Sequence, residues 1–104
     1  MVKDYIGINH NYSKTDRDFF PVIRPEDEYP DAGNEITLGL QYIEKKATVI
    51  FRPTLELKDI PTSLLCFETG AKDRERAVKV LEEAFRKDLD PESELTILFL
   101  KVET

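Results

Sequence analysis

The chain has 104 residues and a formal net charge of −6, with 35% charged residues, 40% hydrophobic residues and one cysteine. This length suits a single domain, residues 1–104, with a core of its own. The lone cysteine excludes an internal disulfide and a cysteine-based zinc site, and no apolar run approaches the about 20 residues that a membrane-spanning helix needs. The negative charge argues against direct binding to nucleic acid or anionic membranes, and without an apolar leader after Met1 we expect a cytoplasmic protein.

The N-terminal third combines strand-like and turn-like segments. Residues 3–9 have the character of a strand. Ser13, three residues before Asp16, resembles a capping pair, which predicts a short helix over 14–20. The apolar residues 19–23 contain a proline, which excludes them from a central strand. We therefore expect this patch to cover an open face of the sheet.

An acidic, proline-containing loop follows at residues 24–35. Its length and composition predict a mobile segment rather than a packed one. The spacing of its acids does not match a loop that wraps a calcium ion. We expect a solvated loop or one that docks on a partner.

A hairpin is predicted in the middle of the chain. Apolar and polar residues alternate over 36–42 and again over 47–52, and a short polar link at 44–46 joins the two runs. One face of the second run carries Ala47, Val49 and Phe51. The proline-bracketed residues 53–61 predict an edge strand or an extended connection.

Residues 63–102 have the pattern of a strand, a helix and a second strand, and the rest of the fold is expected to pack around this unit. The apolar run 64–67 predicts a short strand, and residues 95–102 predict a longer one. Between them an amphipathic pattern predicts a helix over about 71–89, capped by Asp73. Acid-to-base pairs four residues apart support this helix: Glu75–Lys79, Glu82–Arg86 and Glu83–Lys87.

Both predicted strands of this unit are apolar on both faces, as is typical of central strands. In the last strand the two faces carry Leu95, Ile97 and Phe99 on one side, and Leu98, Leu100 and Val102 on the other. One helix covers only one face, so either the N-terminal third or another subunit must cover the second. The predicted fold class is α+β: a two-layer sandwich with a mixed or mostly antiparallel sheet of about four to five strands and one main helix (about 71–89) packed on one face.

A candidate anion site lies where the first strand of the unit turns into the helix, at Thr69, Gly70, Lys72 and Arg74. Free backbone N–H groups at a helix N-terminus favour an anion, and ligands of open α/β units bind beyond the carboxyl ends of strands. The segment has neither a P-loop nor a GxGxxG pattern, and Asp73 would oppose an anion. We favour the alternative that Arg74 ends the core, with its stem packed and its charge paired with a nearby acid.

A candidate partner-binding surface combines the apolar patch with the acidic loop, at Phe19, Phe20, Glu26, Asp27, Glu28, Tyr29 and Asp31. His10 has carboxylates nearby in the sequence but no nucleophile or second set of ligands, so a solvated turn is the favoured interpretation. Cys66 has no histidine or basic neighbour, which indicates a buried, unreactive thiol. We predict no catalytic residues, no metal site and no cofactor.

These patterns favour a small, non-enzymatic protein-binding module, with a homodimer as one form it could take. One alternative is an acidic inhibitor that mimics nucleic acid toward a basic partner protein, with the loop acids as phosphate surrogates. Another is a small-anion-binding sensor or enzyme that uses the helix N-terminus at 70–74.

Overall fold

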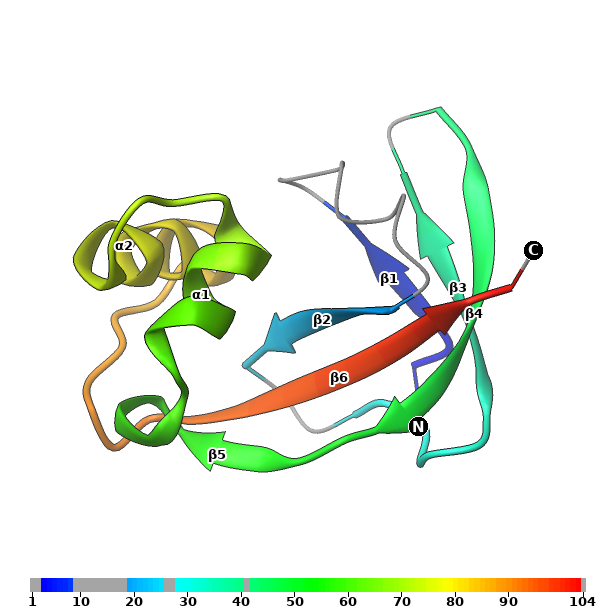
Figure 1. Cartoon of the computed structure of the whole chain (residues 1–104), viewed down its shortest axis with the longest axis horizontal. Helices are drawn as coiled ribbons and strands as arrows, with labels where there is room; N and C mark the ends of the chain where they lie inside the picture. The colour runs from blue at the N-terminus through cyan, green and yellow to red at the C-terminus, as the bar shows by residue number, and fades with distance from the viewer. Residues whose placement is uncertain (1–2, 9–18, 26–27, 41, 104) are drawn as a thin grey trace.

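A computed structural model describes residues 3–8, 19–25, 28–40 and 42–103, which form a curled, mixed sheet and two α-helices (Figure 1). The sheet has six strands: β1 Tyr5–Gly7, β2 Phe19–Arg24, β3 Glu35–Gly39, β4 Glu44–Phe51, β5 Thr54–Glu56 and β6 Glu94–Val102. The helices are α1 Thr62–Thr69 and α2 Arg74–Phe85, and a short 3-10 helix at Leu57–Asp59 follows β5. The α+β class is confirmed, but the curled sheet and the second helix replace the predicted sandwich with one main helix.

Strand β6 is the centre of the sheet. The strand order is β1-β3-β4-β6-β2, and β5 pairs with β6 beyond the end of β4. The pairing of β1 with β3 is parallel, and all the other described pairings are antiparallel. Figure 1 shows the helices at one end of β6, and β1, β3 and β4 at the other. The strand therefore links two separate packing layers.

The two faces of β6 belong to two different cores, as its two-sided apolar pattern predicted. The inner cluster lies inside the curl of the sheet and contains Ile6, Ile8, Phe20, Val22, Tyr29, Ile36, Leu38, Ala47, Val49, Leu98 and Leu100. The helix-side cluster lies under the helices and contains Ile23, Leu57, Ile60, Leu65, Ala77, Leu81, Leu95 and Ile97. The second face of β6 is thus covered by the curled sheet itself, with side chains from the N-terminal third among those that cover it.

The prediction of a strand at residues 64–67 was wrong, because this run lies in α1. A short apolar run fits a buried strand and a buried helix equally well, so periodicity does not separate them. Pro61 precedes the helix, and Gly70 ends it in the left-handed conformation with φ of 78°. Leu65 then points into the helix-side cluster. With no strand there, the predicted strand–helix–strand unit is absent.

Helix α2 confirms the amphipathic pattern, although it is shorter than the predicted 71–89. Asp73 caps it as expected, accepting a hydrogen bond of 2.8 Å from the backbone N–H of Arg76. The helix ends at Phe85, because Arg86 takes a left-handed conformation with φ of 57°. The chain then turns back, and the N–H of Leu89 donates to the Glu82 carboxylate at 2.8 Å. Arg86 and the residues after it therefore lie outside the helix.

The predicted hairpin is confirmed as β3 and β4, with a shifted turn. Gly39 pairs with Glu44, so the turn lies between these two residues and 44–46 belong to β4. The register of β4 against β6 shifts between Val49 and Phe51. Such a bulge adds one residue to one strand and breaks the alternation of faces. As a result Phe51 does not join the buried face of Val49 and is 60% exposed.

The apolar patch at 19–23 is a strand of the sheet rather than a cover for it. It forms most of β2, which pairs with β6 at the end of the strand order, where a proline is tolerated. Of the predicted helix at 14–20, only 19–20 are described, and they belong to β2. The Arg24 guanidinium donates to the Gly7 carbonyl at 2.7 Å and so joins β2 to β1. This contact links the two ends of the strand order and supports the curl.

Candidate binding groove on the helix-side face

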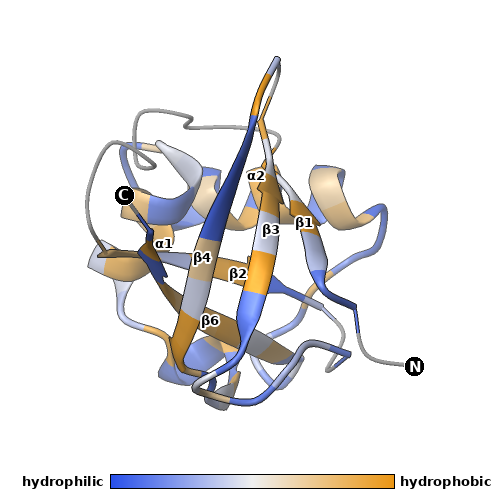
Figure 2. Ribbon diagram, turned by 90° about the vertical axis from the view of Figure 1, so that its right-hand side faces the viewer, coloured by the Kyte–Doolittle hydropathy of each residue, from blue (hydrophilic) through white to orange (hydrophobic). Residues whose placement is uncertain are grey.

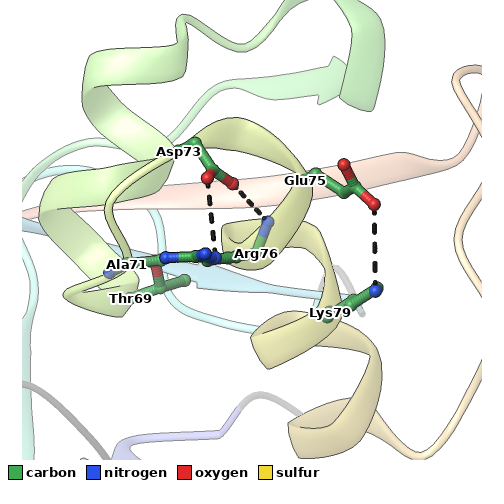
Figure 3. A network of polar contacts seen from close by, with 6 residues as sticks. All are labelled: Thr69, Ala71, Asp73, Glu75, Arg76 and Lys79. Atoms are coloured by element: carbon green, nitrogen blue, oxygen red, sulfur yellow. Dashed lines mark hydrogen bonds and ion pairs between the residues drawn. The ribbon is translucent and has the colours of Figure 1, made fainter.

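The predicted anion site at the start of α2 is not assembled as expected. Thr69 and Gly70 end helix α1 instead of following a strand. The Thr69 hydroxyl donates to the Leu65 carbonyl at 2.7 Å and accepts from the Ala71 N–H at 3.2 Å. The cap of α2 is the Asp73 carboxylate, which occupies the position an anion would need (Figure 3). Local hydrogen bonds therefore already engage the Thr69 hydroxyl and the backbone N–H groups of Ala71 and Arg76.

Arg74 has the structural role that we favoured, with different partners. Its guanidinium donates to the carbonyls of Ile60 at 2.8 Å and Leu57 at 2.6 Å, and to the Thr62 hydroxyl at 3.0 Å. The partners are thus two carbonyls and a hydroxyl instead of an acid. Lys72, the other predicted cation, lies exposed in the turn before α2. Arg74 therefore holds α2 against the 3-10 helix and the start of α1.

The residues of the predicted partner-binding surface are divided between the buried core and the protein surface. Phe20 and Tyr29 are buried in the inner cluster, which removes both from the surface. Tyr29 is only 6% exposed and anchors the described part of the acidic loop in the core, whereas residues 31–34 of that loop lie exposed. Phe19 stays 58% exposed, with the Lys101 ammonium 5.7 Å from its ring centre.

Two of the three described acids of the loop contact a cation, and the third, Glu35, lies beside the Glu103 carboxylate. Glu28 pairs with Lys3 at 3.2 Å, and Asp31 pairs with Arg52 at 3.0 Å. The remaining loop acids of the predicted surface, Glu26 and Asp27, lie outside the described residues, as does His10. The described part of the loop therefore presents two ion pairs, at Glu28 and Asp31, rather than a row of unpaired carboxylates.

The described residues hold no obvious catalytic or metal-binding cluster. Across the described part of the chain, no group of three or more His, Cys, Asp and Glu side chains comes close enough to hold a metal ion. Cys66 is half-buried on α1 and packs against the helix-side cluster. A second groove of about 690 Å³ runs along α2, but Glu75 and Lys79 on its wall pair with each other (Figure 3). The Arg74 guanidinium on the same wall is already bound to the Leu57 carbonyl.

The most distinctive surface is an apolar groove of about 600 Å³ on the helix side of the sheet. It is lined by Pro21, Phe51, Pro53, Leu55, Pro61, Ser63, Leu64, Phe67, Ile97 and Phe99. Ser63 is the single polar side chain among these ten described residues. The groove begins where α1 ceases to cover β6: Leu95 and Ile97 are buried under the helices, and Phe99 is only half-buried.

Two stacked aromatic rings form one wall of the apolar groove. Phe51 and Phe99 lie with ring centres 6.0 Å apart and an angle of 25° between their planes. Strand register brings them together, because Phe99 is opposite Phe51 on β4 and opposite Pro21 on β2. Sequence reasoning missed Phe51, since regular alternation assigns it to the buried face of β4. The bulge that moves it has no signal in the sequence that we can identify.

A rim of charges borders the apolar groove on the same face of the sheet. Lys101 lies two residues beyond Phe99, and Thr48 opposite it donates to the Glu103 carboxylate at 3.1 Å. Glu35, opposite Thr48 on β3, has its pKa raised, first by its hydrogen bond with Glu103 and then by the charge of that carboxylate. The rim thus contains cations and anions side by side.

Comparison with known proteins returned no match: no family model, no curated protein and no solved structure resembles the chain. Among the described residues, no helix combines the length and the apolar character needed to cross a membrane.

Proposed function

We propose that this protein is a small, non-enzymatic protein-binding module and that the apolar groove is its contact surface. The observation that carries the proposal is Phe51, which is 60% exposed and stacks on Phe99 in the apolar groove. Burying one large apolar side chain contributes about 1.5–3 kcal/mol. A contiguous apolar patch beside charged residues is typical of a surface that binds another protein.

The chemistry of the groove supports binding more than catalysis. Catalysis needs nucleophiles, acids or bases held toward one point. Among the described residues that line the apolar groove, Ser63 alone carries a polar side chain. The lone cysteine, which makes no disulfide within the chain, is consistent with the reducing cytoplasm, and we include a cytoplasmic location in the proposal.

The two alternatives have less support. An acidic inhibitor requires a coherent face of carboxylates. Of the described loop acids, Glu28 and Asp31 are each paired with a cation, and only Glu35 lies beside another carboxylate, Glu103. A small-anion site at residues 70–74 requires Arg74 to face a ligand, and its guanidinium is bound to backbone carbonyls.

The test compares proteins captured from the cells that make this chain, using wild type, Phe51→Asp and Tyr42→Asp as baits. Tyr42 is 88% exposed in the β3–β4 turn, which projects from the sheet at the far end of the molecule from α1 (Figures 1 and 2), so its variant is a matched control. We expect the Phe51→Asp bait to capture at least about tenfold less partner than wild type, as for a central interface residue, and the Tyr42→Asp bait to capture as much as wild type. Equal capture by all three baits would contradict the proposed function.

A further inference from the structure

The charges beside the apolar groove form a patch that is complementary to itself. Register places Lys101 on the outer face next to the Phe51–Phe99 wall. Lys46 lies on the same face, since its ammonium donates to the Thr37 hydroxyl of β3 at 2.8 Å. With Glu35 and Glu103 beside them, these two lysines give the rim equal numbers of cations and anions. We call these four residues the mixed rim.

We propose that a second copy of this chain covers the apolar groove, in a symmetric dimer. This inference rests on the proposed function of the groove. In a two-fold contact the same patch of each copy faces its counterpart, so the patch must complement itself in shape and charge. A rim of one sign would repel its own copy, whereas the mixed rim can set lysine against glutamate around an apolar centre.

The apolar centre of the proposed contact is made of large side chains that a second copy would bury. An aromatic side chain contributes about 150–250 Å² when fully buried, so Phe51 and Phe19, each near three-fifths exposed, offer about 100 Å² apiece. The partly exposed Leu55, Leu64, Phe67 and Phe99 extend this apolar centre. The mixed rim borders this centre with charges, which is the arrangement of apolar core and polar rim found in protein interfaces.

The direction in which affinity changes with salt separates this dimer contact from binding to a basic partner. Each copy carries a formal net charge of −6, so two copies repel one another at long range. Screening by salt weakens that repulsion and also the lysine–glutamate attractions of the mixed rim. Exposed pairs of this kind contribute only about 0–1 kcal/mol each, and the buried apolar contact is left in place. Dimerisation should therefore strengthen as salt is added, whereas binding of a basic partner protein should weaken.

The experiment is sedimentation equilibrium of the purified full chain over a wide concentration range, at low and at high salt. For wild type we expect a mass that rises from 12.1 kDa toward twice that value, at lower concentration when salt is high. Phe51→Asp should raise the dimer dissociation constant at least about tenfold, and Tyr42→Asp should leave it unchanged. The thermal unfolding of monomeric Phe51→Asp should match that of Tyr42→Asp, because both side chains are largely exposed.

Three results would overturn the inference. They are a monomeric wild type at the highest concentration and salt, a dimer that Phe51→Asp leaves intact, and a dimer that salt dissociates. If the wild type is monomeric yet captures another protein through Phe51, the second copy is ruled out and the proposed function stands. If neither a dimer nor capture depends on Phe51, both fail.

Discussion

Replacing Arg74 by methionine tests whether this residue is structural or a ligand for an anion. Methionine keeps an unbranched stem but removes the guanidinium that donates to the carbonyls of Leu57 and Ile60. A hydrogen bond to a charged group contributes about 1.5–3 kcal/mol, and a buried carbonyl left without a partner costs about 1–3 kcal/mol. The Leu57 carbonyl keeps a second bond, from the Ile60 N–H at 3.1 Å, so the cost of a lost partner applies to the Ile60 carbonyl. Both carbonyl bonds are partly buried, and the third bond, to Thr62, is exposed. We therefore expect Arg74→Met to lower the free energy of unfolding by about 3 kcal/mol.

Urea unfolding followed by circular dichroism measures this loss, with Lys72→Met as the matched control. Lys72 is exposed, and Lys72→Met removes the same charge two residues earlier in the chain. Its free energy of unfolding should therefore stay within about 0.5 kcal/mol of the wild-type value. Arg74→Lys should lose most of the same free energy, because an ammonium does not reproduce the fork of the guanidinium.

A different result would favour the anion site over the structural role. In that case the free energy of unfolding of Arg74→Met would lie within about 0.5 kcal/mol of the wild-type value. Inorganic phosphate would also stabilise the wild type and not the variant, by mass action on the folded state. Either result would refute the reasoning from the carbonyl bonds.

Three further predictions concern local contacts: a carboxylate pair, a helix cap and a close packing contact at a glycine. Glu103→Gln should lower the pKa of Glu35, which NMR titration measures, and an unchanged pKa would contradict the coupling. A raised folded-state pKa favours the protonated native form. The wild type should therefore gain stability relative to this variant as pH falls through the Glu35 pKa. Asp73→Ala should cost about 1 kcal/mol in urea unfolding through loss of the α2 cap, and a cost near zero would mean that the capping bond contributes nothing. Gly39→Ala should destabilise the protein only modestly, because a Cβ there would overlap the hydroxyl end of the half-exposed Tyr5 ring and displace it. Tyr5→Ala should remove most of that cost in the double variant, and additive effects would refute the clash.

Local patterning in the sequence determined the elements whose residues carry their own signal. Helix α2 combines a cap at Asp73, an amphipathic face and an ion pair between Glu75 and Lys79, all of which depend on neighbours within a few residues. The β3–β4 hairpin follows from alternation of apolar and polar residues, and β6 follows from a nearly continuous apolar run. The two-sided apolar pattern of β6 also predicted correctly that both of its faces are buried.

The tertiary structure decided the features that depend on distant residues. The run at 64–67 is helical because α1 packs Leu65 into the helix-side cluster, a contact with residues far away in the chain. The curl of the sheet brings Arg24 to the Gly7 carbonyl, and a bulge in β4 brings Phe51 out beside Phe99. A bulge and a curl arise from how strands register and twist against one another. For this reason the apolar groove, which both of them shape, had no counterpart in the residue pattern.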